Sequence, residues 1–489
     1  MATKKAAKRA TSSNKPVAQS AKKTAGKARS RTTSRKPVAG AVSTASSRVR
    51  IRMFRQGLGD FFLVTLTRKD GTPFRMLIDC GVIVGTPNAK ARMRELVTQM
   101  KADVDNKLDI VVVTHRHADH VSGFLQAQDL FEDTGLKIGE VWVSWVEDPR
   151  DQLGQQLLAT HAKAEQALRL SATKLQGFGA AAGNEVASLL DFRGEMLGAA
   201  KGSTTTAAVE IAKKLSTKPG SSLRYCRPTD APIELDGTDA RVFVFGPPPD
   251  LSLLGKMDPS KSNPETYGVA AMRSLLRDLG PALGLGADGT PGGGQPFGAS
   301  WTAKLDPAIA PQFIRDTYYD PASDWQRIDT DWLQGASALA LAFDQAVNNT
   351  SLVIAIELGD GDVLLFAADA QVGNWLSWYT LSWTMKDKST VTTLDLLKRV
   401  TFYKVGHHAS HNATLEAQGL ELMEKIAYAM ISVDANMALK KNWGRMPFPA
   451  LLDALDKHTS GRTVRADQPI PAAAQGAVAG NNDYYELTL

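Results

Sequence analysis

Short hydrophobic runs begin at Val49 and are separated by turn residues, a pattern typical of β-strands. The turns read Gly57-Leu58-Gly59-Asp60 and Asp70-Gly71-Thr72-Pro73. We expect the first three strands, which form an opening β-meander, at Arg50–Phe54, Phe61–Thr67 and Arg75–Asp79.

A helical pattern around Ala89–Lys101 comes next, followed by the β-branched run Ile110–Thr114. Because this run ends at His115, the histidines that follow should lie on a strand-to-helix loop. A further strand is expected at Val141–Val146. The first half of the chain therefore predicts mixed α/β structure.

Two long segments interrupt the strand pattern. Residues 150–220 are rich in Ala, Leu, Lys and Gln and predict an inserted helical subdomain. Residues 250–335 are rich in Gly, Pro and Asp and predict long loops with short helices. The second insertion could serve as a lid, a substrate platform or a partner site, and its composition does not choose among them.

A second set of hydrophobic runs completes the pattern, with no repeat of fixed period. We expect these strands at Ile233–Leu235, Arg241–Phe245, Ser351–Leu358, Val363–Ala367 and Thr401–Val405. We predict one large catalytic domain over residues 48–489, carrying both insertions.

Charge is segregated along the chain. Residues 1–50 hold fourteen Lys and Arg and no acid, which leaves 43 basic against 51 acidic residues in the remainder. Residues 1–47 have too few apolar side chains to form a core, so we expect a disordered tail. Its charge predicts salt-sensitive binding to nucleic acid, while a solubilising tail or a targeting segment remains the alternative.

Composition excludes membrane-spanning proteins and disulfide-rich proteins. No stretch approaches the roughly eighteen apolar residues of a membrane span. The chain has two cysteines, Cys80 and Cys226, too few for a disulfide framework. We therefore expect a cytoplasmic protein that does not enter membranes.

The residues after the run Ile110–Thr114 carry the clearest chemistry. The segment His115-Arg116-His117-Ala118-Asp119-His120 holds three imidazoles and one carboxylate within six residues. Zinc and similar divalent ions prefer such ligands, and a tight loop can direct alternate side chains at one ion and the others at a neighbour. The sequence therefore predicts a metal centre here.

His-x-His-x-Asp-His after a buried strand, followed by Val121-Ser122-Gly123, resembles the motif of the metallo-β-lactamase superfamily. This resemblance implies an αββα sandwich, with two mixed β-sheets between helices. It also implies a supporting aspartate at the end of an earlier strand, which Asp79 matches. Cys80 is then expected to be a packed neighbour and not a ligand.

Two later segments extend the resemblance. Asp369 matches the family's bridging acid, and Gly406-His407-His408-Ala409-Ser410 matches its final histidine motif. The branch that they resemble contains the soluble hydrolase domain of bacterial DNA-uptake channels and the choline-phosphate esterases. Further matches to this branch are Gly57-Leu58-Gly59-Asp60, Asn348-Asn349-Thr350-Ser351, Ile431-Ser432-Val433-Asp434 and Pro447.

The chain departs from the family in two places. No histidine matches the third motif, and His161 lies in the helical insertion, where it is either a ligand or a surface residue. Ala409 stands where the branch usually has glycine, which restricts the backbone beside His408. A weaker first site, or a single ion, would follow from the missing third-motif histidine. His411 and His458 are expected at the surface or in loops, and His411 could alternatively contact a metal ligand from behind.

The resemblance implies two divalent ions, zinc first, with manganese or iron as alternatives. His115 and His117 would hold one ion; Asp119, His120 and His408 would hold the other; Asp369 would bridge them. Asp79 would orient a metal-bound hydroxide, and His407, with Lys404, would stabilise the leaving oxygen.

An aspartate at the bridging position, where β-lactamases have a cysteine, turns the expectation toward phosphoesters. With the basic tail, it favours hydrolysis of phosphodiesters in nucleic acid. The alternatives are a hydrolase of small esters, thioesters or lactones, and a nucleic-acid-associated binding protein with a degenerate metal site.

Overall fold

The structure is a computed structural model, which describes residues 48–177, 204–254, 310–319, 332–441 and 443–489. The predicted tail of residues 1–47 lies outside the described residues, as does most of the predicted loop-rich insertion. No helix in these ranges is both long and apolar enough to cross a membrane. The molecule is an α/β protein built on two large mixed sheets.

The first large sheet contains eight strands, in the order β16-β17-β1-β2-β3-β4-β5-β6. Neighbouring strands run antiparallel from β16 to β3 and parallel from β3 to β6. Its strands are β1 Val49–Phe54, β2 Phe61–Thr67, β3 Pro73–Cys80, β4 Lys107–Val113, β5 Lys137–Ser144, β6 Ser222–Cys226, β16 Val478–Gly480 and β17 Tyr484–Thr488.

The second large sheet contains seven strands, in the order β15-β14-β13-β10-β9-β8-β7. The four strands from β15 to β10 are parallel, and the remaining pairs are antiparallel. Its strands are β7 Ile233–Glu234, β8 Arg241–Gly246, β9 Val353–Glu357, β10 Val363–Phe366, β13 Val400–Lys404, β14 Tyr428–Ile431 and β15 Thr463–Arg465. A small hairpin joins β11 Ser382–Thr384 to β12 Thr390–Thr392.

Alternation along the strands explains how the two sheets pack. In β9, Ile354 and Ile356 join the hydrophobic cluster that lies between the sheets, whereas Val353 and Ala355 join the cluster on the outer face. Successive side chains of a strand point to opposite faces, so a strand buried on both faces is apolar throughout. Both sheets are therefore covered on two sides.

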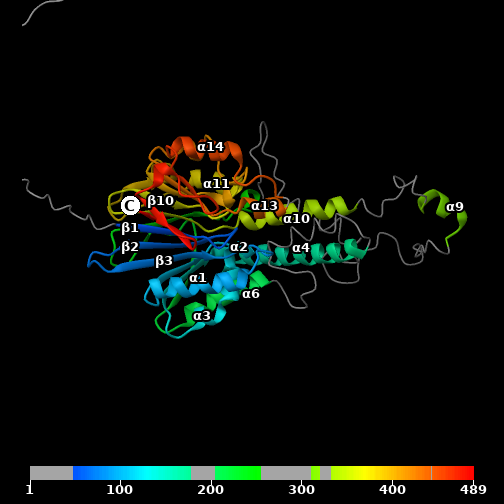
Figure 1. The fold of residues 1–489 in the computed structure, drawn as a ribbon, viewed down its shortest axis with the longest axis horizontal. Helices are drawn as coiled ribbons and strands as arrows, with labels where there is room; N and C mark the ends of the chain where they lie inside the picture. The colour runs from blue at the N-terminus through cyan, green and yellow to red at the C-terminus, as the bar shows by residue number, and fades with distance from the viewer. Residues whose placement is uncertain (1–47, 178–203, 255–309, 320–331, 442) are drawn as a thin grey trace, which may run out of the picture. The chain divides into compact units, whose positions relative to one another are not determined.

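Helices cover the outer faces (Figure 1). The first sheet packs against α1 Ala89–Asp103, α2 Ala118–Gln126, α3 Gln128–Glu132 and α6 Thr204–Lys214. The second packs against α11 Val372–Ser377, α12 Thr393–Leu397, α13 Ala435–Lys440 and α14 Pro449–His458. The layers follow the order helices, sheet, sheet, helices.

The described part of the helical insertion is helical as predicted, with α4 Gln152–Gly177 followed by α6. The second insertion contributes α7 Leu251–Leu254, α9 Gln312–Ile314 and the π-helix Arg315–Tyr319. The helix α10 Trp332–Asn348, which was not predicted, lies beside α4 (Figure 1). His161 of α4 contacts Phe343 of α10, with 5.5 Å between ring centroids.

The two sheets share one strand arrangement. In each, a central strand pairs antiparallel on one side and parallel on the other, namely β3 in the first sheet and β10 in the second. Each is followed in the parallel part by the strand that leads into a histidine motif, β4 or β13. Carboxyl ends of parallel strands are where open α/β sheets bind ligands. This arrangement positions the candidate site.

Candidate metal centre

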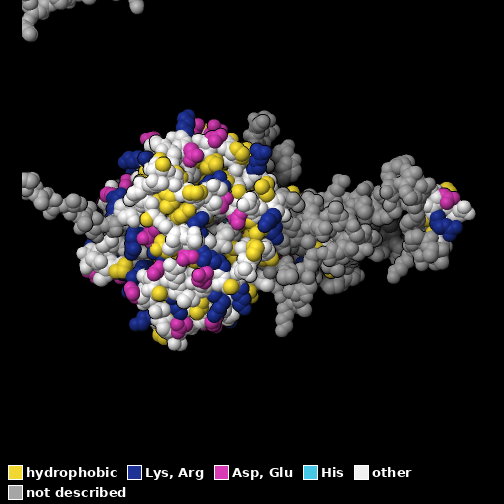
Figure 2. Space-filling model, viewed as in Figure 1, with side chains coloured by type: hydrophobic (Ala, Val, Ile, Leu, Met, Phe, Trp, Pro, Cys, Tyr) yellow, Lys and Arg dark blue, Asp and Glu magenta, His cyan; other side chains and the backbone are white. Residues whose placement is uncertain are grey.

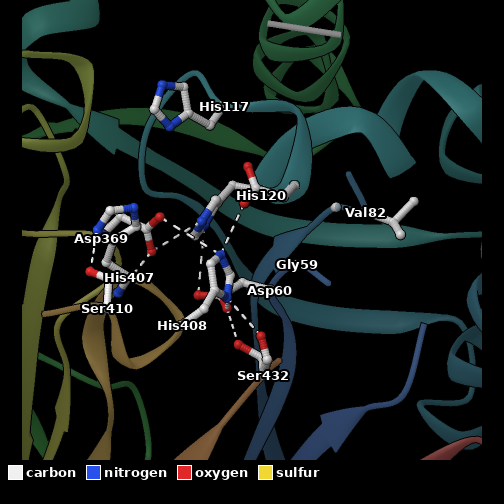
Figure 3. Close-up of polar contacts among 12 residues, drawn as sticks. Gly59, Asp60, Val82, His117, His120, Asp369, His407, His408, Ser410 and Ser432 are labelled. Carbon is white, nitrogen blue, oxygen red and sulfur yellow. Dashed lines mark hydrogen bonds and ion pairs between the residues drawn. The ribbon is translucent and has the colours of Figure 1, made fainter. Parts of the chain in front are cut away.

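The histidine cluster predicted from the sequence lies between the end of β4 and the start of α2. His117 occupies the position before the first residue of α2, and Asp119 lies in its first turn. Asp369 follows β10, and His407 and His408 follow β13 (Figure 3). Four separate strand ends, counting Asp79 in β3, therefore meet at one place.

The structure brings together all six residues predicted as metal ligands, and each is at least 95% buried. They form two groups, and within each group the ligand atoms lie within 4.8 Å of one another. One group is Asp119, His120, Asp369 and His408, and the other is His115, His117 and Asp369. Asp369 belongs to both, as the resemblance implied for a bridging acid.

Distances within the larger group are short. Nε2 of His408 lies 2.9 Å from Oδ2 of Asp119, and Nε2 of His120 lies 3.2 Å from Oδ1 of Asp369. Nε2 of His115, in the smaller group, lies 3.9 Å from Oδ2 of Asp369. Two ligand atoms bound about 2.1 Å from one ion are separated by about 3.4 Å in a tetrahedral site, so these spacings suit a shared ion.

Several of these ligand atoms have no hydrogen bond. Nε2 of His115, Oδ1 of Asp119 and Oδ2 of Asp369 are buried and lack a hydrogen-bond partner among the described residues. Buried polar atoms are rarely left in this state because it costs free energy. Imidazole and carboxylate donors are a set that divalent zinc or manganese accepts. This cluster could hold metal.

Asp79 supports the ligand loop with both carboxylate oxygens. Oδ1 accepts a hydrogen bond from the backbone N of Thr114 at 2.8 Å. Oδ2 accepts one from Oγ1 of Thr114 at 2.6 Å and lies 2.7 Å from Nδ1 of His120. A proton on Nδ1 would leave Nε2 of His120 free to bind metal. These contacts fix the backbone of Thr114 and the ring of His120.

Asp60, the last residue of the Gly57-Leu58-Gly59-Asp60 motif, is a site residue that was not predicted. Its carboxylate pairs with Nζ of Lys404 and accepts a hydrogen bond from Oγ of Ser432. Lys404 is 1% exposed and also lies 3.7 Å from Oδ1 of Asp369. This ammonium therefore lies between the carboxylates of Asp60 and Asp369.

His407 lies next to the metal ligands in a separate polar contact. Its Nδ1 lies 2.7 Å from Oγ of Ser410, which donates its own proton to Asn412. Its Nε2 faces Nδ2 of Asn348 on α10 at 3.4 Å. Burial lowers the pKa of His407, which favours the neutral ring.

Two glycines allow the loops to approach one another. A Cβ on Gly81 would overlap the backbone of Asp119 and His120. Gly59 has φ +146°, and its Cβ would lie 2.5 Å from the backbone oxygen of Gly81. Side chains at these positions would push the turn that holds Asp60 and the strand that holds Asp79 away from α2.

Non-glycine residues with left-handed backbone gather at the same site. His407, His408 and Ala409 have φ values of 42°, 49° and 61°, and Asp79 has 56°. Such conformations cost free energy in L-residues and persist where the surroundings impose them. The predicted restriction at Ala409 is therefore a real one, because glycine would adopt this backbone without strain.

Electrostatics within the cluster are strongly perturbed. Burial lowers the pKa of His120, but the carboxylates of Asp369, Asp60, Asp79 and Asp119 outweigh it and raise this pKa well above its usual value. Burial raises the pKa of Asp369, yet His120 and His408 lower it well below the ordinary range. Burial, with the charges of His120 and His117, depresses the pKa of His115. Perturbation on this scale is common at functional sites.

The remaining predicted residues have mixed outcomes. Cys80 is fully buried and belongs to neither ligand group, as expected. His411 is exposed, as expected. The expectation that His161, if not a ligand, lies at the surface is wrong. It is 4% exposed on α4, because α10 covers it, and it joins no ligand group within the described ranges.

No protein-family model matches this chain, and a comparison with curated proteins finds no match either.

Proposed function

We propose that this protein is a metal-dependent hydrolase of the metallo-β-lactamase fold, with a centre for two divalent ions. The observation that carries the proposal is the pair of buried ligand groups that share Asp369. Each of the six ligands was named from the family resemblance, and the six come from segments up to 293 residues apart. The order of layers, with helices outside two mixed sheets, supports the same fold.

In this proposal, His115 and His117 would hold one ion, and Asp119, His120 and His408 would hold the other; Asp369 belongs to both groups. Divalent ions bound there would supply a nucleophile near neutral pH, because they lower the pKa of water from 15.7 to about 7. Zinc fits the donor set best, and manganese or iron are alternatives. The binding-protein alternative needs a degenerate site. The larger group keeps four buried candidate ligands, which argues against it, while the smaller group keeps three and lacks the family's third-motif histidine.

The chain's own residues prepare the centre. Asp79 fixes the ring of His120 and the backbone of Thr114. Lys404 balances the charge of Asp60 and Asp369, so that several carboxylates can share a buried space. His407, with a neutral ring turned toward Asn348, is placed to contact a substrate or accept a proton beside Asp369.

We propose phosphodiesters of nucleic acid as the substrate. An aspartate in the bridging position supports phosphoesters through the family resemblance. The concentration of Lys and Arg in residues 1–50 supports a polyanion, because contacts with phosphates release counterions. Basic and acidic side chains are interspersed on the face of the domain seen in Figure 2, so that face offers no large basic patch of its own.

The test is a nuclease assay on single- and double-stranded DNA and RNA, with zinc or manganese added to the intact chain. A His117→Ala, Asp119→Ala double variant removes one ligand from each half of the centre. We expect cleavage by the intact chain and a loss of at least about 10³-fold in the double variant.

The matched control is His411→Ala, which removes an exposed histidine close in sequence to the ligand His408. We expect this variant to cleave at the rate of the intact chain. Metal-dependent turnover of small phosphoesters, thioesters or lactones without nuclease activity would retain the hydrolase and overturn the nucleic-acid substrate. No turnover of any ester by the metal-loaded protein would overturn the proposed function itself.

A further inference from the structure

We propose that Asp344, on the helix α10, is a positioning residue that holds the metal-binding ring of His117. The inference rests on the metal centre of the proposed function and not on its substrate. Oδ1 of Asp344 lies 3.5 Å from Nε2 of His117, and the Asp344 side chain is 13% exposed. Nothing in the sequence motifs pointed to this residue.

The other three histidine ligands share one arrangement. Each has an oxygen acceptor at Nδ1, which leaves Nε2 turned toward the ligand cluster. For His120 the acceptor is Oδ2 of Asp79 at 2.7 Å. For His408 it is the backbone oxygen of Ser432 at 2.7 Å.

For His115, the third of these ligands, the acceptor is Oγ1 of Thr114 at 3.1 Å, whose own proton is donated to Asp79. An acceptor on one ring nitrogen fixes the proton there and leaves the other nitrogen as the metal donor. Such an acceptor also prevents the ring from rotating out of the site. His117 needs the same support if it is to act as a ligand.

Asp344 supplies that support from the opposite side of the ring. Figure 3 shows the His117 ring apart from the cluster around Asp369, with one nitrogen turned toward that cluster and the other away from it. Asp344 is not one of the group formed by His115, His117 and Asp369, whose ligand atoms all lie within 4.8 Å of one another. A carboxylate beside Nε2 and outside this group fits a proton acceptor behind the ring better than a fourth ligand.

The separation of 3.5 Å is longer than a usual hydrogen bond. A small movement of the carboxylate toward Nε2 would make the contact a charge-assisted hydrogen bond, which such pairs form at about 2.7–2.9 Å. The other oxygen of Asp344 lies 3.4 Å from Nδ2 of Asn348, one turn along α10. Asn348 in turn faces His407, so one face of α10 carries polar contacts to two histidines of the site.

This arrangement links the insertions to the metal centre. The helix α10 packs against α4 through Phe343 and His161, and Phe343 precedes Asp344 directly. The packing of two inserted helices would therefore set the position of the carboxylate. One half of the centre would depend on them, while the half containing His120 would depend on Asp79 in the central sheet.

The experiment measures the binding of zinc alone to the full chain, by competition with a chromophoric chelator and by native mass spectrometry. We expect Asp344→Ala to lower the affinity for one of two ions by about 10–100-fold and to leave the other unchanged. Asp344→Asn keeps an oxygen that can accept the proton of Nε2, so its loss should be less than about 10-fold. Phe343→Leu keeps the carboxylate and a large apolar side chain against α4, and should retain both affinities.

A spectroscopic readout separates positioning from general stability. In the zinc-loaded chain, the Nε2 proton of His117 should exchange slowly with water and give an NMR signal that disappears in His117→Gln. The same signal should be lost in Asp344→Ala and retained in Phe343→Leu.

Three results would overturn the inference. Unchanged zinc affinity in Asp344→Ala would remove the role and leave the proposed function intact. Equal losses in Asp344→Asn and Asp344→Ala would make Asp344 a direct ligand, and an equal loss in Phe343→Leu would make the effect one of helix packing. Failure of the intact chain to bind zinc would instead reject the metal centre, which separates the two failures.

Discussion

The residues that prepare the candidate centre are as specific as its ligands. Asp79 uses its two oxygens for three contacts, two with Thr114 and one with His120. All of these atoms are buried, so water cannot replace a lost partner. Substitutions behind the ligands should therefore act on metal affinity as well as on stability.

Asp79→Asn tests this at the central sheet. The amide has one acceptor oxygen where the carboxylate has two, so it cannot accept all the hydrogen bonds from Thr114 and His120. The His120 ring then loses its fixed tautomer. We expect zinc affinity to fall about 10–100-fold, measured by chelator competition. Asp109→Asn changes a carboxylate of β4 that binds Arg68 and the backbone of Arg75. Zinc affinity in this control should not change; an equal fall in both variants would contradict the role of Asp79.

Lys404→Met tests the charge balance beneath the ligands. Burial lowers the pKa of Lys404, but Asp60 and Asp369 outweigh it and raise this pKa, which shows how strongly the acids hold the ammonium. Removing it leaves buried carboxylates without compensation, and we expect a loss of about 3–5 kcal/mol in the free energy of unfolding.

The control for Lys404→Met is Arg94→Met, which breaks the exposed pair between Arg94 and Asp129. This variant should change the free energy of unfolding by less than about 1 kcal/mol in denaturant titrations. Similar losses of unfolding free energy in the two variants would show that the buried pair of Lys404 and Asp60 stabilises the fold no more than an exposed pair does.

The candidate ligands and the supporting Asp79 could be predicted from sequence, whereas Asp60 and Asp344 could not. His115, His117, Asp119 and His120 lie within six residues, so their shared chemistry is visible without a fold. Asp60 meets Lys404 across 344 positions, and only the packing of two sheets brings them together. Asp344 lies four positions before Asn348 on one helix, a spacing that signals a shared face but names no partner.

At the scale of elements, the hydrophobic pattern predicted the strands that carry the site. The runs at β2, β3, β4, β8, β10 and β13 are mostly buried and rich in apolar residues. The strands that were not predicted have three to five residues each and are β6, β11, β12, β14, β15, β16 and β17. The helix α10 was missed because its sequence, with Gly335, follows directly on a segment rich in turn residues.

Close packing between elements makes Gly81→Ala a sharp test. The methyl group would overlap the first turn of α2, at the backbone of Asp119 and His120, and backbone cannot move aside as a side chain can. We expect a loss of about 2–3 kcal/mol in unfolding free energy, together with weaker zinc binding.

Gly135→Ala provides the matched control for Gly81→Ala. Its added methyl group would meet only the Asp133 side chain, at 3.4 Å, which is ordinary contact. We expect a change of less than about 0.5 kcal/mol in unfolding free energy and unchanged zinc affinity. A tolerated alanine at Gly81 would contradict the contact between β3 and α2.

The end of β13 offers a test in alkaline solution. Burial raises the pKa of Tyr403 from 10.0 to about 12, and its hydroxyl contacts Oγ1 of Thr414 and the backbone N of Gly406. The unfolded chain therefore loses this proton first as pH rises. The neutral phenol contributes fully to the free energy of unfolding below pH ~10. This contribution falls by about 2.7 kcal/mol as pH rises to ~12.

Tyr403→Phe should flatten this decline, as measured by unfolding free energies between pH 9 and 12. Burial also raises the pKa of Tyr379 to about 12, but that side chain is 36% exposed, so Tyr379→Phe should have a smaller effect. An unchanged slope in Tyr403→Phe would show that this phenol is not protected by the fold.

At the scale of the whole molecule, the last strand of the chain pairs with the first strand in the eight-stranded sheet. The C-terminal strand β17 lies between β1 and β16, and Arg50 pairs with Thr488 across the sequence. Nothing local in Tyr484–Thr488 indicates this partner, because the pairing depends on the complete sheet. The two halves of the candidate centre also meet only in the complete fold. Hydrophobic periodicity therefore could not predict that they lie together, and only the family resemblance did.

The charge of the whole chain gives the last prediction. Residues 1–47 hold twelve Lys and Arg without an acid, and residues 48–489 hold 45 basic against 51 acidic residues. A duplex should therefore be attracted by the first segment and weakly repelled by the rest. If six to ten of the twelve charges contact phosphates, affinity for duplex DNA should fall about 10³–10⁵-fold between 50 and 200 mM salt.

A chain starting at Ser47 should retain its zinc affinity and melting temperature, because β1 begins at Val49 and the hydrogen bonds of Arg48 to Leu489 and Asp362 are kept. In fluorescence anisotropy, this shortened chain should bind DNA with little salt dependence, and cleavage by it should lose the sensitivity to salt that the intact chain shows. An identical salt slope in both chains would mean that the domain itself binds the phosphates and that the basic segment has another task.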